Sequence, residues 1–297
     1  MLRTIQLSGL ILLTFIVFAC SSVQHLDDLS AAAITADESG NSQEAFEAYE
    51  KLITAQRESG VEPDGTIYMR AGKLAHELGY LPKAIEYLEL ARHTPEADEN
   101  TFYTLALVYR HVDNLSREIT NLERYVERYP DGAEIEAVRV RLFETLVESM
   151  NHDQAFSLWD DLPAKRHQEE SLLTGYFQVN QALGFNDVLT DIAEELLEIN
   201  PDNMTALDWL AKKHFRMADT RYREEMLAYE RNRTHRQYAI LLRALDVINT
   251  DLHIALDYFK RLYAQEQRSE YASFLANIYE RFQNEERARY YRQRATN

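Results

Sequence analysis

Apolar residues recur every three or four positions along most of the chain, which is the spacing of one face of an α-helix. The clearest stretch runs from Tyr68 to Pro95. Its face-forming positions are Tyr68, Ala71, Gly72, Ala75, Ala84, Leu88 and Ala91. The pattern breaks near Gly79 and resumes at Pro82, which suits a first helical turn because its missing N–H costs nothing there. Small residues on both segments let two backbones approach closely, so this stretch predicts a packed antiparallel helical hairpin.

The same unit recurs along the chain. Pairs of small residues stand twelve positions apart: Ala33 with Ala45, Gly72 with Ala84, and Ala276 with Ala288. Four of the six prolines are separated by 35, 33 and 38 residues: Pro95, Pro130, Pro163 and Pro201. A period of this length is typical of a repeat architecture in which each unit buries its apolar face only against its neighbours.

On these residues the chain resembles the tetratricopeptide repeat (TPR) family, whose unit is a helix–turn–helix of about 34 residues. Other units carry matching positions: Phe102, Leu105, Ala106, Tyr109, Leu122, Tyr125, Leu142, Leu146, Ala155, Trp159, Leu162, Leu196, Leu207, Leu210, Ala211, Leu241, Leu245, Ala255, Phe259, Leu262, Leu275, Ala276 and Tyr279. The resemblance runs from about Leu26 to Ala295. It implies an all-α fold, an α-solenoid of about eight TPR-like helix-turn-helix repeats.

Some units depart from the pattern. Glu118 and Phe143 stand where a small residue is expected. In the sixth unit we expect a separate second helix over Asp219–Arg233, which lacks the small residue, and a seventh unit that begins near Tyr238. The last helix, with four arginines beside Tyr290 and Tyr291, is interpreted as a solvated cap on the final apolar surface.

The first twenty residues predict a membrane anchor. Leu7–Phe18 is apolar but too short to cross a bilayer as a helix, and it suits the apolar region of a signal peptide. Val17, Ala19 and Cys20 make this segment similar to a bacterial lipoprotein signal peptide, which implies cleavage before Cys20 and its lipidation, including by palmitate. Ser21, by the sorting rule of some bacteria, favours the outer membrane, facing the periplasm.

The domain organisation that follows has three parts. We expect a signal peptide over 1–19, a lipidated Cys and tether over 20–29, and a TPR solenoid over 30–297. The solenoid is more acidic over 30–200 and more basic over 201–297. More than one acyl chain is needed for stable anchoring, and a multiply acylated Cys20 meets that condition.

Composition excludes several other classes. The chain has 297 residues but only 9 Gly and 6 Pro, too few for the turns that an all-β sandwich or barrel needs. A single Cys excludes a disulfide framework. There is no Gly-rich phosphate loop, no metalloprotease His pair and no nucleophile elbow, and adjacent acidic residues such as Asp160 and Asp161 point about 100° apart on a helix. We therefore expect no enzyme, no catalytic residue, no metal and no cofactor.

Charge is uneven along the chain. Residues 21–200 hold 14 Lys and Arg against 35 Asp and Glu, whereas residues 201–297 hold 17 against 14. The basic residues concentrate between Lys212 and Arg236. They form either a solvated helix pair whose charges balance locally or a cationic patch for an acidic partner segment or an anionic head group. Nucleic acid is a poor candidate because the chain carries a net charge of −17 and an apparent export signal.

The resemblance also implies where a partner binds, because the first helix of each TPR hairpin faces the concave groove. The candidate partner-binding residues carried over in this way are Lys73, Tyr103, Arg110, Gln178, Lys212, Arg216, Arg243 and Asn277. The expected partner is an extended or helical protein segment in that groove. The pattern by which some TPR proteins clamp a C-terminal carboxylate is not reproduced here.

These observations favour a membrane-anchored TPR lipoprotein that acts as a protein–protein interaction scaffold or adaptor in the bacterial cell envelope. Envelope or outer-membrane assembly is the process that fold-level analogy suggests, since lipid-anchored TPR proteins recur there, including one in the β-barrel assembly machinery. Two alternatives stay open. One is a surface-exposed lipoprotein that captures a glycan or nutrient, with Trp159 and Trp209 to stack on sugars. The other is a regulatory subunit of an envelope enzyme.

Overall fold

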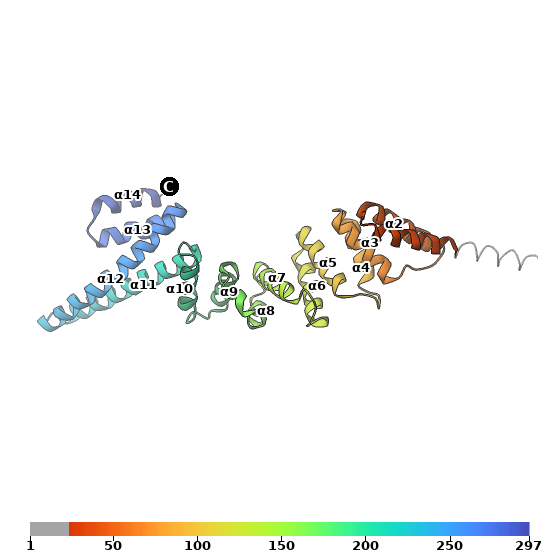
Figure 1. Ribbon diagram of the computed structural model, residues 1–297. Coiled ribbons are helices and arrows are strands. Elements are labelled where there is room, and N and C mark those ends of the chain that lie inside the picture. Colours follow the sequence, from red (N-terminus) through yellow and green to blue (C-terminus); the bar gives the residue numbers. More distant parts are fainter. Residues whose placement is uncertain (1–23, 297) are drawn as a thin grey trace, which may run out of the picture. The chain divides into compact units, whose positions relative to one another are not determined.

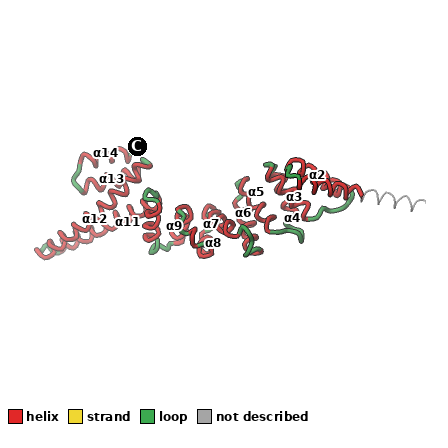
Figure 2. Tube along the Cα trace, viewed as in Figure 1, coloured by secondary structure: helices red, strands yellow, loops and turns green. Residues whose placement is uncertain are grey.

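The structure is a computed structural model that describes residues 24–296, and all regular structure in these residues is helical (Figures 1 and 2). Residues 24–38 form the first helix. The other α-helices are α2 (Ser42–Glu58), α3 (Gly65–Glu77), α4 (Leu81–Ala91), α5 (Glu99–His111), α6 (Leu115–Arg128), α7 (Ile135–Glu148), α8 (His152–Leu158), α9 (Glu170–Leu183), α10 (Leu189–Ile199), α11 (Met204–Arg231), α12 (His235–Gln265), α13 (Ser269–Arg281) and α14 (Glu285–Ala295). The all-α, TPR-like solenoid class is therefore confirmed.

The chain divides into two compact units, and the boundary falls between Asn151 and His152. Unit 1 contains the helix 24–38 and α2–α7, in which consecutive helices pack as antiparallel hairpins. Unit 2 contains α8, two short 3₁₀ turns at Trp159–Asp161 and Ala164–Arg166, and the hairpins α9/α10, α11/α12 and α13/α14. Each unit has its own buried apolar cluster.

The small residues of the repeat lie where helices meet, as predicted. A Cβ atom added at Gly72 of α3 would lie 2.6 Å from Cγ of Leu88 on α4, so only glycine fits this close contact. Ala84 and Leu88 are both fully buried. Gly79, with φ of +77°, makes the turn between the two helices in the left-handed region that favours glycine. The spacing of small residues thus reports real helix–helix contacts.

The departure at Glu118 has a structural reason. This carboxylate is 1% exposed on α6, and it accepts two hydrogen bonds from the guanidinium of Arg141 on α7, at 2.6 and 3.1 Å. The bidentate pair satisfies a charge that could not be buried alone. Phe143, the other departure, is buried on α7 and belongs to the core. The helical hairpin of the repeat therefore forms at these positions although larger side chains replace the expected small residues.

The division of the sixth and seventh predicted repeats is wrong. Residues 219–233 are not a separate helix but belong mostly to α11, which has 28 residues and is followed by α12 with 31. The two helices form one long antiparallel hairpin (Figure 1). No Gly or Pro occurs after Pro201 to end a helix early, and Ala211 and Ala218 are fully buried along the seam.

The N-terminal boundary also differs from the expectation. Residues 24–29, assigned above to the tether, already belong to the first helix. Leu26 and Leu29 are half-buried and continue the apolar face that Ala33 and Ala36 complete, which extends the helix toward the N-terminus. The predicted signal peptide and Cys20 lie outside the described residues. Within residues 24–296, no helix combines the length and the hydropathy that a membrane crossing requires.

Candidate functional site

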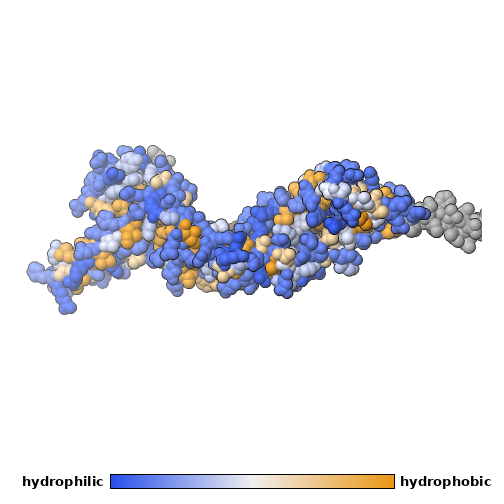
Figure 3. Space-filling view, in the orientation of Figure 1, coloured by the Kyte–Doolittle hydropathy of each residue, from blue (hydrophilic) through white to orange (hydrophobic). Residues whose placement is uncertain are grey.

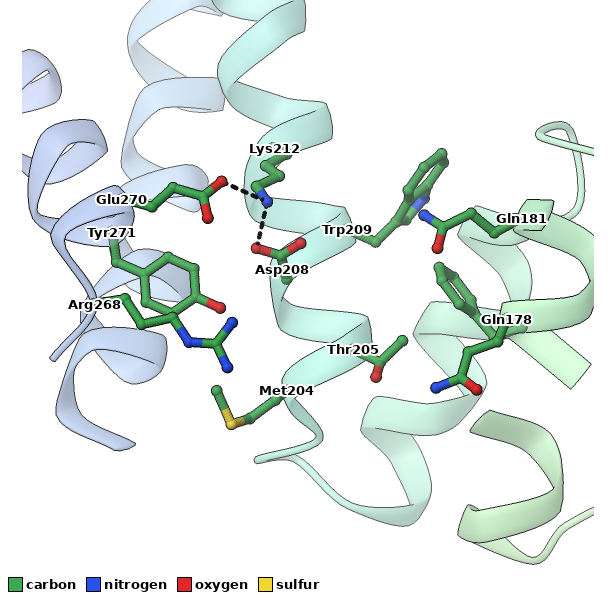
Figure 4. A pocket seen from close by; sticks show the side chains of 11 residues that line it. Gln178, Gln181, Met204, Thr205, Asp208, Trp209, Lys212, Arg268, Glu270 and Tyr271 are labelled. Atoms are coloured by element: carbon green, nitrogen blue, oxygen red, sulfur yellow. Dashed lines mark ion pairs between the residues drawn. The ribbon is translucent and has the colours of Figure 1, made fainter. Parts of the chain in front are cut away.

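A groove in unit 2 is formed by the first helices of three successive hairpins, α9, α11 and α13 (Figure 4). Its volume is about 310 Å³. The lining residues are Phe177, Gln178, Gln181, Met204, Thr205, Asp208, Trp209, Lys212, Arg268, Glu270 and Tyr271. Polar side chains from three helices thus converge on one concave surface, the feature that marks a binding site.

The helix positions follow from local sequence. Asn203 is the N-cap of α11, where its side chain accepts a hydrogen bond from the amide of Ala206 at 3.0 Å. Its Nδ2 donates to Glu170 Oε1 on α9 at 2.9 Å, which fixes the start of α11 against the start of α9. From there, Thr205, Asp208 and Lys212 follow at spacings of three and four, so they share one face of α11. That face is the floor of the groove.

Lys212 lies between two carboxylates at the centre of the groove. Its Nζ is 2.9 Å from Asp208 Oδ1 on the same helix and 2.8 Å from Glu270 Oε1, and the second pair joins α11 to α13 (Figure 4). Burial by itself lowers the pKa of Lys212, but the hydrogen bonds to Glu270 and Asp208 outweigh it and the pKa is raised. Lys212 therefore stays charged, and most of its charge is already compensated inside the protein.

Aromatic side chains form the apolar part of the groove. The ring of Trp209 meets that of Phe177 edge to face at 5.8 Å, and the guanidinium of Arg216 lies 5.7 Å from the indole centroid. The indole Nε1 is buried and has no hydrogen-bond acceptor within the described residues. On the opposite side, Arg268 lies over the ring of Tyr271 at 5.7 Å. Trp209 thus offers a donor that a ligand oxygen could satisfy.

Two amides complete the site. Gln178 and Gln181 are one helical turn apart on α9 and point into the groove (Figure 4). Neither side chain makes a hydrogen bond to another residue of the described chain, so each has a free donor and a free acceptor. With the ion pairs compensated, what the groove offers is neutral hydrogen bonding beside aromatic surface. This chemistry matches a polypeptide backbone better than a strongly charged group.

The structure brings only some of the predicted residues to this groove. Gln178 and Lys212 line it, and Arg216 borders it through Trp209. Asn277 is exposed on α13 but does not line the groove, and Arg243 lies on α12, a second helix rather than a first one. The prediction placed Arg243 on a first helix because it divided the long hairpin into two repeats.

The other three predicted residues belong to unit 1. Lys73 is exposed on α3, Arg110 is exposed near the end of α5, and Tyr103 of α5 is half-buried against Tyr125 with ring centroids 6.2 Å apart. All three are on first helices, as the resemblance implied, but none lines the groove of unit 2. Their role in partner binding remains a prediction.

Sequence reasoning missed Gln181, Arg268 and Glu270 as lining residues, and it named Trp209 only as a residue that could stack on sugars. Trp209 and Gln181 each lie three positions from a residue that was predicted, Lys212 and Gln178. Extending the search by one helical turn on the same face would have found both. Arg268 and Glu270 flank the start of α13, where no repeat position marks them.

One pair of histidines is brought together by the repeat. His76 on α3 and His111 on α5 are 35 residues apart, and His76 Nε2 lies 3.4 Å from His111 Nδ1. Burial, and then the neighbouring His111, lowers the pKa of His76. Within residues 24–296, no group of three or more His, Cys, Asp or Glu side chains is arranged to hold a metal ion.

Trp159 is placed differently from Trp209. Its indole is stacked between Tyr176 at 4.1 Å and His167 at 4.4 Å, and the residue is 7% exposed. Both faces of the ring are therefore covered by other rings of unit 2. Trp159 offers no face on which a sugar could stack. Of the two tryptophans that suggested glycan binding, Trp159 therefore no longer supports it.

The helical hairpins and the groove between their first helices define an all-α solenoid fold of TPR-like helix–turn–helix repeats. No protein-family profile matches the chain, and no curated protein matches it. It is similar in structure to the C-terminal part of a TPR repeat-containing protein from Cytophaga hutchinsonii, with a TM-score of 0.50, 14% identity, and coverage of 89% of this chain and 92% of that one. That likeness supports the fold.

Two further solved structures resemble it more weakly. A tetratricopeptide repeat protein from Parabacteroides merdae matches with a TM-score of 0.43 and 13% identity, over 92% of this chain and 93% of that one. YrrB, described as a TPR protein with an unusual peptide-binding site, matches with a TM-score of 0.46 and 19% identity, over 61% of this chain and 88% of that one.

Proposed function

We propose that this chain is a non-enzymatic TPR scaffold that binds an extended segment of a protein partner in the groove lined by α9, α11 and α13. The observation that carries the proposal is the convergence of free amides, a buried indole N–H and compensated ion pairs on one concave surface. A partner backbone supplies alternating donors and acceptors, which Gln178, Gln181 and Trp209 can pair with.

Specificity in such a groove comes from the aromatic surface. Trp209 offers ring surface for apolar or aromatic side chains of the partner, while the amides hold its backbone. Because Lys212 is already paired with Asp208 and Glu270, binding should depend only weakly on salt. This distinguishes the groove from a surface that recruits partners by charge.

Site-specific photocrosslinking of the full chain in cells tests this proposal. A photoreactive residue at Gln181 should capture a protein partner, whereas the same residue at Glu195, exposed on the second helix α10, should not. Trp209→Ala in the Gln181 background should lower capture by about tenfold, because a truncated aromatic anchor commonly costs more than 1 kcal/mol. Equal capture at Gln181 and Glu195 would exclude the groove as the binding site.

We further propose that the scaffold is anchored at the bacterial envelope through lipidated Cys20, at the outer membrane and facing the periplasm. The support is the apolar run that ends at the single Cys of the chain. Cys20→Ala should release the protein from the membrane fraction and abolish metabolic labelling with palmitate. Retention of the variant in the membrane pellet without acyl label would contradict the proposal.

A further inference from the structure

The α11/α12 hairpin extends beyond the helices packed on it. α11 and α12 have 28 and 31 residues, whereas α9, α10, α13 and α14 have 14, 11, 13 and 11. Over residues 224–247, no hydrogen bond, ion pair or ring contact reaches any other helix of the described chain. Beyond the contacts of Arg281 with Asp219 and Tyr222, Figure 1 shows the α11/α12 hairpin projecting from α13 and α14.

One side of the hairpin is covered near its base and open near its tip. At the base, Arg281 from α13 pairs with Asp219 and lies over the ring of Tyr222 at 5.2 Å. Met226 and Tyr229 follow Tyr222 at four and seven positions, so they continue the same side of α11 toward the tip. The helix α13 therefore ends partway along this side of the hairpin.

The opposing helix adds apolar residues to the same side. Tyr238 lies 5.8 Å from Tyr229 between ring centroids, which places Tyr238 on this side of α12. Leu242 and Leu245 follow it at four and seven positions. Tyr238 is 47% and Leu242 46% exposed. Leu245 is half-buried against the core of unit 2, so the open part of this side is Met226, Tyr229, Tyr238 and Leu242, which we call the distal face. Figure 3 shows hydrophobic atoms between hydrophilic ones along this hairpin.

The tip beside the distal face is basic. Residues 231–236 contain Arg231, Arg233, His235 and Arg236 and no carboxylate. No carboxylate of the described residues pairs with any of these three arginines. Within the predicted patch between Lys212 and Arg236, Lys212 is thus compensated in the groove, whereas the three arginines at the tip have no carboxylate partner among the described residues.

We propose that the distal face binds an amphipathic helix of a protein partner, with the carboxylates of that helix at the end that meets the hairpin tip. The face runs between two antiparallel helices, in line with the surface that α13 covers at the base, so a third helix continues the packing found there. Its apolar side chains would cover Tyr238 and Leu242, and its carboxylates would pair with Arg233 and Arg236. Arginine and tyrosine are enriched at protein interfaces.

An anionic membrane surface fits the hairpin less well than a protein does. Glu224, Glu225 and Glu230 stand on the same part of α11 as the distal face, and an anionic bilayer would repel them. A partner helix with acidic residues only at the end near the hairpin tip would place no negative charge beside these three glutamates. The distal face is a different surface from the groove lined by α9, α11 and α13. Binding at the distal face therefore does not depend on the function proposed for that groove.

The probe is a fluorescent peptide of about 18 residues, with leucines three and four positions apart, glutamates at one end and neutral polar residues elsewhere. Binding is measured by anisotropy to the full chain held in phosphatidylcholine nanodiscs, so that no free detergent competes. Leu242→Glu should weaken binding by about tenfold or more. Arg233→Glu with Arg236→Glu should weaken it comparably, and a peptide with lysines at that end should recover binding to this double variant.

Matched controls distinguish binding at the distal face from non-specific hydrophobic binding. Leu227→Glu replaces a leucine that is 51% exposed on the outward side of α11 and should leave the affinity unchanged. Circular dichroism should give the same melting temperature for all variants, because every changed side chain is exposed. The proposal is overturned if the peptide does not bind, if Leu227→Glu weakens binding as much as Leu242→Glu, or if the lysine peptide fails to bind the double variant.

Two other occupants of the distal face give distinct results. If a second copy of the chain occupies it, the protein dimerises without peptide and Leu242→Glu makes it monomeric in analytical ultracentrifugation. If lipid occupies it, phosphatidylglycerol in the nanodisc suppresses peptide binding to the unchanged chain. Either outcome overturns the proposal of a partner helix.

Discussion

The α3/α4 hairpin of unit 1 and the α11/α12 hairpin of unit 2 both pack through an interface of small and large residues, but they differ in length and in how many neighbouring helices hold them. In α3/α4, Gly72, Ala84 and Leu88 are buried and the helices have 13 and 11 residues. In α11/α12, the seam runs from Ala218 and Ile248, which belong to the core shared with α13, on to Leu241, which is buried outside that core. A repeat-length hairpin is held from both sides, whereas the long one is held only at its base.

The difference shows which residues of a repeat protein stabilise the fold and which are left exposed for binding. Because each hairpin is stabilised by its neighbours, residues beyond the reach of a neighbour contribute little to folding. Leu242 is 46% exposed, whereas Leu88 is fully buried. Side chains at the end of the long hairpin are thus available to contact something outside the chain.

The largest expected effect is on buried leucine. Leu88→Ala should lower the free energy of unfolding by roughly 2–5 kcal/mol, because it removes buried methyl groups and leaves a cavity against Gly72. Leu242→Ala, the matched change on the distal face, should cost about 0.5 kcal/mol or less. Urea denaturation followed by circular dichroism compares the two. Similar losses at both positions would show that the distal hairpin is as tightly packed as the repeat.

The next effect concerns charge. Glu118→Gln should cost about 2–3 kcal/mol, less than the full loss of a buried ion pair, because Arg141 keeps Glu144 at 3.4 Å and Glu148 at 3.8 Å. Arg236→Gln at the hairpin tip, where no carboxylate of residues 24–296 pairs with Arg236, should change stability by less than about 0.5 kcal/mol. The same denaturation series measures both. A neutral Glu118→Gln would mean that the bidentate pair is not formed in solution.

A smaller effect is expected at alkaline pH. Burial, and then the hydrogen bond to Glu50, raises the pKa of Tyr87 to about 12. The phenol of the unfolded chain ionises near pH 10, so the stability from neutral Tyr87 is full below pH 10 and is lost as pH rises toward 12. Tyr87→Phe should reduce the fall in the denaturation midpoint between pH 9.5 and 11.5. An identical fall in both proteins would contradict the buried phenol.

The smallest effect is at the base of the long hairpin. Asp219→Asn removes the partner of Arg281 and of Arg223, groups that are partly exposed, and should cost about 0.5 kcal/mol. Hydrogen exchange should quicken at amides near Asp219 and stay unchanged in α3 and α4. Faster exchange throughout unit 2 would instead indicate that this contact holds the whole hairpin in place.

The sequence predicted the fold well where small residues report contacts. Gly72, Ala84 and Leu88 could be assigned from spacing because close backbone approach admits few residue types. Glu118 could not, since its partner Arg141 lies 23 positions away and in no repeat register. The length of α11 and α12 could not be read from the absence of Gly and Pro after Pro201, because α13 and α14 lack them too and have 13 and 11 residues.

The groove was only partly predictable. Spacing placed Gln178 and Lys212 on inward-facing helices, but it could not show that Glu270 compensates Lys212, because Glu270 comes from another hairpin. The same holds for Trp209, whose buried Nε1 depends on how α9 packs on α11. Pairing between hairpins is a property of the packed solenoid and not of any single repeat.

The placement of the tryptophans gives the molecule two built-in optical probes. The chain has two tryptophans, Trp159 and Trp209, and both belong to unit 2. Indole emission therefore follows residues 152–296 alone, while far-ultraviolet ellipticity follows both units. Trp159, sandwiched between two rings, reports on the integrity of the core. Trp209 lies at the groove with an unpaired N–H, so a bound backbone carbonyl should shift its emission and make occupancy visible without a label.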